Sequence, residues 1–382
     1  VRGILRVIVL VVAPPSCEES ARARVNSICR AHVGLNPLVV GAQEAAHVER
    51  AVARMAHHVA GETVSLRGYG AIRNMGLAVA AVLGHDVVVF LDDDEVALDA
   101  DFLVNAVYGL GSLTRQNLQV LAKSGFVDEF DSPYAEPTEE WSERYWSKAA
   151  DFNKVMERAQ TGASRITRSN HLCGGCCALH AAAYSRVPFD PYITRGEDLD
   201  YVLNLRANGL DAWFDNAWFV RAQPPEEMAP VPSTFMQDVY RWLYEYRKLD
   251  AMNARRDLRT ITPESLMPYP APWLSAEVRQ RVFRTALRRF VTGPNRLAYL
   301  GILTKGRYEA DKFARSASTR YLSFAMVWPR IVSALWEDRF LQSAILSTGE
   351  VSAPISSAVH AARDGADPLA DTGSLPSLGD LS

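Results

Sequence analysis

Apolar runs of strand length alternate with segments of helical spacing along the first part of the chain. Val7 to Val12 is β-branched and predicts a strand, and Ser20 to Ala31 has the period of a helix. Pro37 to Val40 and Ala42 to Ala60 repeat this strand and helix. The resulting β-α-β-α order is typical of an α/β fold.

The alternation continues to an apolar strand that ends in carboxylates. A short strand near Thr63 to Leu66 leads through two glycines into a helix from Ile72 to Leu83, and Asp86 to Leu91 is almost continuously apolar. Such a strand is typical of a sheet that is covered on both faces. We therefore expect a mostly parallel, doubly wound sheet flanked by helices, with the functional site at the carboxyl ends of its strands.

Beyond residue 100 the pattern gives way to helices. The further elements expected are helices over 101–113, 197–208, 235–252, 275–292 and 308–341, and strands over 119–125, 172–180 and 212–220. The acidic segment Asp128 to Glu140 is expected to be a loop or flap. Because prolines cluster before the long helices, we expect an α/β domain over 1–229, a helical region over 230–347 and a disordered tail over 348–382.

The composition is that of a globular protein without a general affinity for polyanions. The 382 residues include 41 Lys and Arg against 44 Asp and Glu, and the net charge of −3 argues against nucleic acid as a partner. The longest apolar runs are shorter than the roughly 20 residues that span a bilayer, or are interrupted by charges. The N-terminal run also lacks the pattern of a secretory signal, so we expect a cytoplasmic protein.

Five cysteines in a long chain favour reduced thiols over a disulfide scaffold. Cys173-x-x-Cys176 leaves a zinc site open, with His171 and His180 nearby, but the sequence has no second pair of this kind. We therefore expect these small residues to pack in a buried strand.

The strongest chemical signal is an acidic turn directly after a strand. Phe90-Leu91 is followed by Asp92, Asp93, Asp94 and Glu95. Adjacent carboxylates repel one another, so a neutralising cation is expected. Mg²⁺ and Mn²⁺ suit such a turn, because they bind through one or two carboxylates while water and substrate phosphate complete the shell. A solvated acidic turn is the alternative for this motif taken alone.

Other motifs accompany the acidic turn in a fixed order. Arg73-Asn74-x-Gly76 lies upstream, and Gly174-Gly175 and Arg195-Gly196-Glu197-Asp198 lie downstream. Together with the proline loop after the first strand, this order resembles the GT-A nucleotide-sugar glycosyltransferases, in particular glycosyltransferase family 2, over residues 5 to 222. The resemblance implies a GT-A, Rossmann-like fold, a nucleotide-diphosphate sugar donor and a hydroxyl acceptor.

Applied to this sequence, the resemblance implies a D-x-D metal motif. Asp94 would hold a Mn²⁺ or Mg²⁺ ion that bridges the diphosphate, and Asp92 would contact the ribose or the metal, with Asp93 beside them. Such a cation would stabilise the charge that develops on the departing nucleoside diphosphate.

The resemblance also implies residues that bind the nucleotide sugar. In chain order they are Pro14, Glu18, Gln43 or Glu44, Arg73, Asn74 and Gly175. The residues before Asn74 would contact the base, ribose or diphosphate, although the Arg73 guanidinium also suits a surface helix charge. Glycine at 175 would let a sugar approach the backbone closely, and tight packing is the alternative explanation.

Inverting transfer needs a carboxylate that removes the acceptor proton as the acceptor oxygen attacks the anomeric carbon. The resemblance implies Asp198 in this role, with Glu197 positioning the sugar or acceptor. The free N–H groups and the dipole at a helix start favour acidic residues, which explains one of Glu197 and Asp198 without catalysis. Asp200 is expected at the surface or behind these two residues.

The chain departs from the family pattern at two places. Trp218 to Gln223 contains no His where many metal-dependent relatives have one, so the metal takes fewer protein ligands or Arg221 replaces part of its charge. Gln237 is one residue too far from Arg241-Trp242 for the Gln-x-x-Arg-Trp motif of membrane polymerases. One residue is about 100° on a helix, so the role of that motif is not assigned.

The helical region carries a local positive charge. Residues 279–315 include ten Lys and Arg against two Asp and Glu, a net charge of +8. Such a stretch suits an anionic acceptor or an anionic membrane surface, and a solvated helix face is the alternative. We expect a small or soluble acceptor with the helical region as its lid and wall; a peripheral enzyme acting on lipid carriers is the rival.

The sequence therefore predicts a metal-dependent glycosyltransferase, inverting with Asp198 as base. A retaining GT-A transferase of the glycosylglycerate-synthase type stays open, because sequence does not fix stereochemistry. A sugar nucleotidyltransferase would need a glycine-rich basic loop where this chain has Ala13 to Cys17. The intact carboxylates at Asp92, Asp94 and Asp198 argue against a non-enzymatic sugar-binding protein.

Overall fold

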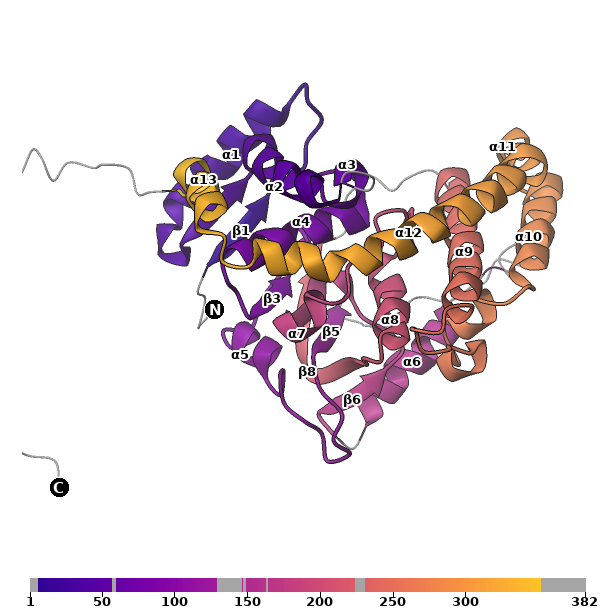
Figure 1. Ribbon diagram of the computed structural model, residues 1–382. Helices are drawn as coiled ribbons and strands as arrows, with labels where there is room; N and C mark the ends of the chain where they lie inside the picture. The colour runs from indigo at the N-terminus through magenta and orange to yellow at the C-terminus, as the bar shows by residue number, and fades with distance from the viewer. Residues whose placement is uncertain are drawn as a thin grey trace, which may run out of the picture.

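The computed structural model describes residues 6–56, 60–128, 146, 149–162, 164–223 and 231–351. Within these ranges it is an α/β structure with a mixed, curled sheet and helices packed around it (Figure 1). Most of the expected acidic flap, the proline-rich segment 224–230 and the tail from residue 352 lie outside the described residues.

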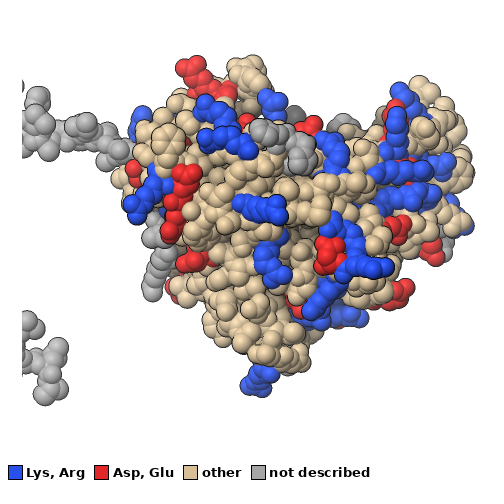
Figure 2. All heavy atoms as spheres, in the orientation of Figure 1, with Lys and Arg blue, Asp and Glu red and all other residues tan. Residues whose placement is uncertain are grey.

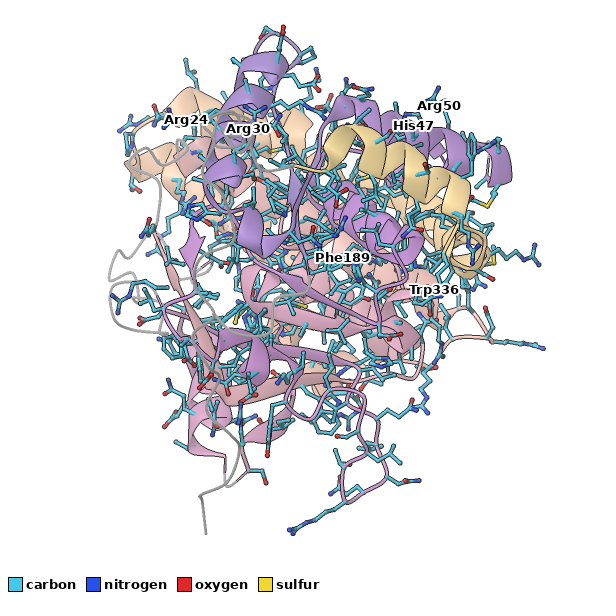
Figure 3. All side chains as sticks on the ribbon, turned by 90° about the vertical axis from the view of Figure 1, so that its left-hand side faces the viewer. Arg24, Arg30, His47, Arg50, Phe189 and Trp336 are labelled. Atoms are coloured by element: carbon cyan, nitrogen blue, oxygen red, sulfur yellow. The ribbon has the colours of Figure 1, made fainter. Side chains whose placement is uncertain are left out.

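The first part of the chain forms two strand-helix units, as expected. Strands β1 (Val7–Leu10) and β2 (Pro37–Val40) pair in parallel and are followed by α1 (Glu18–Ala31) and α2 (Ala42–Met55). Strand β2 is buried along its length because α13 (Arg339–Gly349), from the far end of the described chain, packs on β2 and α2. Figure 3 shows the outward side chains of this layer at Arg24, Arg30, His47 and Arg50.

The strand expected near Thr63 to Leu66 is absent from the structure. This segment consists of the end of α3 (Ala60–Thr63) and a series of bends before α4 (Tyr69–Val82). The side chain of Asn74 donates a hydrogen bond to the Thr63 carbonyl at 2.9 Å. Part of the segment's backbone is therefore satisfied by a helix side chain and not by a neighbouring strand.

The main sheet has the order β3-β7-β5-β8-β4, and β6 pairs with β8. Its strands are β3 (Val87–Phe90), β4 (Glu95–Val96), β5 (Ala122–Asp128), β6 (Ile166–Ser169), β7 (Cys177–His180) and β8 (Ala212–Ala222). Among these described strands only β5 and β8 pair in parallel. The expectation of a mostly parallel sheet was therefore wrong, because an apolar run buried on both faces has the same pattern in either direction.

Smaller elements connect these strands. They are η1 (Val33–Leu35), α5 (Phe102–Val107), α6 (Ala149–Thr161), η3 (Gly174–Cys176), α7 (Ala181–Tyr184) and α8 (Glu197–Ala207). Helix α8 confirms the expected helix over 197–208. It ends before Gly209, whose φ of 78° is in the left-handed region that favours glycine.

Helices dominate the chain after residue 230, as expected. They are α9 (Val231–Asn253), η4 (Pro263–Leu266), η5 (Ala271–Trp273), α10 (Val278–Thr292), α11 (Arg296–Gly301), η6 (Ile302–Gly306) and α12 (Arg307–Leu335). Helix α12 packs on α9 and then on α4, so it crosses from the helical region to the first strand-helix units (Figure 1). Among the described residues, no helix combines the length and apolar composition that a membrane crossing needs.

The two regions share one core. The largest cluster of buried apolar side chains runs from Leu38 in β2 to Ile345 in α13 and includes residues of α4, α8, α9 and α12. Phe189, in the interior of the view in Figure 3, stacks on Tyr201 with ring centroids 4.1 Å apart. Helix α9 begins close to residue 230, and buried side chains from both sides of this point belong to the cluster.

Candidate active site

A cavity of about 1970 Å³ lies beside β3 and the acidic turn that follows it. Its walls include Arg73 of α4, the turn from Asp92 to Glu95, and Glu197 and Asp198 at the start of α8. The volume exceeds the ~300–1,000 Å³ of common small-molecule sites, so the cavity is large enough for a small-molecule ligand. The structure therefore brings the main motifs of the sequence to one surface.

Sheet pairing explains why these motifs meet. Strands β3 and β7 pair so that Phe90 is opposite Cys177, which sets Gly174–Cys176 beside the acidic turn. A Cβ at Gly175 would lie 1.8 Å from Oε2 of Glu95, and one at Gly174 would lie 2.8 Å from Nη2 of Arg73. In this structure the two glycines permit close packing of charged side chains. A sugar contact at Gly175 stays a prediction.

Arg73 connects the carboxylates of the two motifs. Its Nη2 lies 2.7 Å from Oδ1 and 3.0 Å from Oδ2 of Asp92, and its Nε lies 3.4 Å from Oε1 of Glu197. Burial alone would lower the pKa of Arg73, but the charges of Asp92 and Glu197 outweigh burial and raise that pKa. In this state Arg73 neutralises carboxylates of the site.

The other acidic side chains of the turn differ in their surroundings. Glu95 is half-buried and accepts a hydrogen bond from the Asp92 N–H at 2.9 Å. Burial raises the pKa of Glu95 to about 7, and the charges of Asp92 and Asp94 act in the same direction. Asp93 and Asp94 are exposed and line the cavity.

The carboxylates fit a divalent cation that binds together with a substrate. Among the described residues, no group of three or more His, Cys, Asp or Glu is arranged to hold a metal ion. This finding also gives no support to zinc at Cys173 and Cys176. Asp94 and Asp92 offer one or two carboxylates, which is what Mg²⁺ and Mn²⁺ take when substrate phosphate and water supply the remaining ligands. The donor set therefore suits a cation that arrives with a diphosphate.

Asp198 is oriented by backbone N–H groups. Its Oδ2 accepts a hydrogen bond from Gly174 at 3.2 Å, and its Oδ1 accepts one from Leu199 at 2.7 Å. Burial raises the pKa of the neighbouring Glu197, and the charge of Asp198 adds to this effect. Gly196 precedes the pair with a φ of 73°. Its left-handed conformation favours glycine at this helix start.

Two residues to which the sequence assigned no role also line the cavity. Arg241 of α9 lies with its Nε 3.1 Å from Oε1 of Glu245, and a Cβ at Gly196 would lie 2.0 Å from its Cζ. His171 is buried with Nε2 3.2 Å from Sγ of Cys173, and burial lowers its pKa. The sequence signal for Arg241 was the Arg241-Trp242 pair of the Gln-x-x-Arg-Trp motif. The extra residue in this chain changes the direction of Gln237 on the helix, but it does not affect the Arg-Trp pair itself.

Four predicted nucleotide-site residues do not line this cavity. They are Pro14, Glu18, Glu44 and Asn74. Glu44 is fully buried, and its carboxylate pairs with both terminal nitrogens of Arg22 at 2.6 and 2.7 Å. It also accepts the Gly41 N–H at 2.9 Å, so it holds the start of α2. Glu18 accepts the Ala42 N–H at 2.9 Å at the same helix start.

Asn74 is a structural residue as well. Its amide donates to the carbonyls of Thr63 and Phe189 at 2.9 Å, and its oxygen accepts the Phe189 N–H at 2.9 Å. The side chain is fully buried. That Glu44 and Asn74 contact the nucleotide stays a prediction; in this structure their side chains form hydrogen bonds within the protein.

Two further expectations concerned charges near the site. Asp200 is fully buried and pairs with Nζ of Lys248 at 2.7 Å, and Lys248 also pairs with Asp190 at 2.6 Å. Asp200 therefore lies behind the site and not at the surface. Arg221 lies on β8 opposite Val96, with its guanidinium 4.0 Å from Asp128, and does not line the cavity.

Comparison with known proteins finds a similarity to a solved structure. No protein-family model matches the sequence, and no curated protein does. The solved structure of a mannosyltransferase from Pyrobaculum calidifontis, in complex with GDP-Man and Mn²⁺, is similar over 87% of this chain and 78% of its own, with a TM-score of 0.45 and 16% sequence identity. The residues of the cavity therefore carry the functional proposal.

Proposed function

We propose that this chain is a GT-A-type glycosyltransferase that moves a sugar from a nucleoside-diphosphate donor to a hydroxyl acceptor. The observation that supports this most is the meeting of Asp92 to Glu95, Arg73 and Asp198 at one cavity. A merely solvated acidic turn would not need a largely buried guanidinium bound to it. Helix-start chemistry alone would not bring Asp198 to the same cavity as that turn.

The acidic turn would bind the diphosphate end of the donor. Asp94, with Asp92, would hold Mn²⁺ or Mg²⁺, and such a cation, when bound, stabilises the negative charge that develops on the departing nucleoside diphosphate. The Arg73 guanidinium lies 2.7 Å from the Asp92 carboxylate and 3.4 Å from the Glu197 carboxylate. Its positive charge offsets the repulsion between these two carboxylates and keeps them together at the site. Asp93 and Gly175 complete the proposed donor contacts.

Asp198 would act as the base. In an inverting transfer the acceptor oxygen bonds to the anomeric carbon while the bond from that carbon to the diphosphate oxygen breaks. The hydroxyl proton passes to Asp198, and the electron pair leaves with the diphosphate. The N–H groups of Gly174 and Leu199 orient this carboxylate, and Glu197 beside it would position sugar or acceptor.

Product analysis separates this function from its rivals. The protein is incubated with nucleotide sugars and hydroxyl acceptors in Mn²⁺, and the products are identified by mass spectrometry and by the anomeric signals in NMR. We expect a glycosylated acceptor of inverted configuration and a free nucleoside diphosphate. A retained configuration would remove Asp198 from the role of base. Pyrophosphate formed from a nucleoside triphosphate and a sugar phosphate would instead identify a nucleotidyltransferase.

A further inference from the structure

Helix α10 carries an apolar stripe on the side that faces away from the protein. Its inner side packs into the core with five buried residues: Val278, Val282, Thr285, Ala286 and Arg289. Phe283, Leu287 and Val291 follow one another at four-residue spacing on the opposite side, and all three are exposed, Val291 by 57%. The solvent-facing side of such a helix normally carries polar residues. The outer side of α10 thus carries three exposed apolar side chains.

Exposed apolar residues continue into the next elements. Leu297 and Leu300 of α11 are exposed, Leu297 by 83%, and so is Tyr308 at the start of α12. The guanidinium of Arg307 lies 5.3 Å from the ring centre of Phe283, so the start of α12 adjoins the stripe of α10. We call the six exposed side chains the α10–α12 surface: Phe283, Leu287, Val291, Leu297, Leu300 and Tyr308.

Basic side chains flank this surface. Arg284 follows Phe283 directly, Arg296 precedes Leu297, and Lys312 lies one turn after Tyr308; all three basic residues are exposed. Figure 2 shows Lys and Arg gathered at the end of the molecule that α10, α11 and the start of α12 form in Figure 1. Asp311, a partly buried acidic residue of α12, pairs with three arginines: Arg247, Arg279 and Arg315.

The combination of apolar stripe and positive charge selects one kind of partner. A second copy of this chain would bring like charges together around the stripe, which is unfavourable. Nucleic acid would use the charges but leave Phe283, Leu287 and Val291 in water. An anionic bilayer surface accepts both, because apolar side chains enter the boundary between headgroups and acyl chains while Lys and Arg remain at the lipid phosphates. We propose that the α10–α12 surface docks this protein on anionic lipid membranes, with α10 lying in the plane of the interface.

Three packed side chains lead from the inner side of α10 to the cavity. The guanidinium of Arg289, on the inner side of α10, lies 4.7 Å from the ring centre of Phe235. Phe235 packs on Trp146 with ring centroids 5.0 Å apart, and Trp146 lines the cavity. Docking would therefore hold the cavity near lipid headgroups, which favours an acceptor at the membrane over a freely soluble one. That consequence rests on the proposed function, whereas docking itself does not.

Vesicle flotation of the full chain tests the docking. We expect binding to vesicles that contain phosphatidylglycerol, little binding to pure phosphatidylcholine, and weaker binding as salt rises. Leu287→Asp places a charge in the apolar stripe and should weaken binding about tenfold or more. The triple variant Arg284→Gln, Arg296→Gln and Lys312→Gln should weaken it about 100-fold, since each basic residue contributes about a fivefold factor.

Matched variants at the other end of the molecule serve as controls. Phe340→Asp changes a side chain of α13 that is 84% exposed, and Arg24→Gln with Arg30→Gln and Arg339→Gln removes three exposed charges far from α10 (Figure 1). These variants should bind like the wild type, and circular dichroism should show all variants folded. Absence of binding to anionic vesicles, or equal losses in the controls, would overturn the proposal. So would a wild-type dimer that Leu287→Asp converts to a monomer without lipid, because the surface would then belong to a second copy.

Discussion

Asp92 and Asp198 are both carboxylates of one cavity, but their partners differ. Asp92 lies against the guanidinium of Arg73, whereas Asp198 is oriented by neutral N–H groups of Gly174 and Leu199. A carboxylate oxygen that accepts one hydrogen bond can still accept another. Asp198 is therefore the carboxylate better arranged to receive a proton, and Asp92 the one held by a fixed cation.

Asp198→Asn should separate catalysis from binding. The amide keeps the shape of the side chain and removes the base, so turnover should fall by about 10²-fold or more, while affinity for the nucleoside diphosphate changes little. Steady-state kinetics and calorimetry measure the two quantities. Asp250→Asn, at an exposed position of α9, is the matched control and should behave as wild type. Loss of nucleotide affinity with unchanged turnover per bound donor would make Asp198 a binding residue.

Asp94→Asn should affect the cation. Asp94 is exposed, so its replacement should leave the free energy of unfolding within about 0.5 kcal/mol of wild type. The affinity for Mn²⁺ in the presence of a nucleoside diphosphate should fall about tenfold or more, because one of at most two carboxylate ligands loses its charge. Calorimetric titration of Mn²⁺ gives the affinity. An unchanged Mn²⁺ affinity would show that the cation binds elsewhere.

The burial of the cysteine thiols predicts how fast each of them reacts. Burial raises the pKa of the Cys173, Cys176 and Cys177 thiols, so these thiols stay protonated at pH 8. Cys17 is exposed. Iodoacetamide at pH 8 should label Cys17 in minutes and leave Cys173, Cys176 and Cys177 unmodified until urea is added, as peptide mass spectrometry would show. Rapid labelling of Cys173 in the native protein would contradict its burial.

Among the elements, α8 and α9 are joined by a buried ion cluster. Nζ of Lys248 on α9 pairs with Asp200 on α8 and with Asp190, which also accepts a hydrogen bond from Tyr244 at 2.6 Å. Burial raises the pKa of Asp200 to about 6, against the opposing charge of Lys248. The cluster fixes α9, the first helix of the C-terminal region, against α8, whose first turn contains Asp198.

Lys248→Met should destabilise the protein by about 3–5 kcal/mol, because two buried carboxylates would lose their cation. Urea unfolding measures this loss. Adding Asp190→Asn and Asp200→Asn to the variant should restore part of it. Lys154→Met, which breaks an exposed pair with Asp151 on α6, is the control and should cost less than about 1 kcal/mol. A similarly small cost at Lys248 would show that the cluster does not hold the two helices together.

The elements also show what sequence can and cannot predict. Helices such as α8 and α10 and strands such as β2 follow from local periodicity, and they lie where the sequence indicated. Strand direction does not follow from periodicity, which is why the antiparallel pairing of β3 with β7 was missed.

At the site, the acidic turn and the start of α8 were recognisable because each motif is local. The hydrogen bonds of Glu44 with Arg22 and of Asn74 with Phe189 could not be predicted, because these partners are distant in sequence. Arg241 went unassigned for a similar reason: only the packing of α9 against Gly196 brings it to the cavity. Contacts between distant segments decide such roles, and apart from the Arg241-Trp242 pair the sequence contains no local signal for them.

At the scale of the whole molecule, the α/β part and the helical region should unfold together. Their buried side chains form one cluster, and α12 packs on both α9 and α4. Urea unfolding followed by tryptophan fluorescence and by circular dichroism should give one coincident transition. The fragment 1–229, which would expose the surface that α9, α12 and α13 cover, should not fold by itself. Two separated transitions, or a folded fragment, would show independent domains.

The proposed function is the transfer of a sugar from a nucleotide donor by the residues of this cavity. The most direct measurement is the release of nucleoside diphosphate from a panel of nucleotide sugars, in Mn²⁺ and in chelator, by wild type, Asp94→Asn, Asp198→Asn and the Asp250→Asn control. We predict metal-dependent release from at least one donor by the wild type and the control, with turnover lowered about 10²-fold or more in the two site variants. Folded wild-type protein that releases nucleoside diphosphate from no donor, or equal release by all four proteins, would contradict the proposed function.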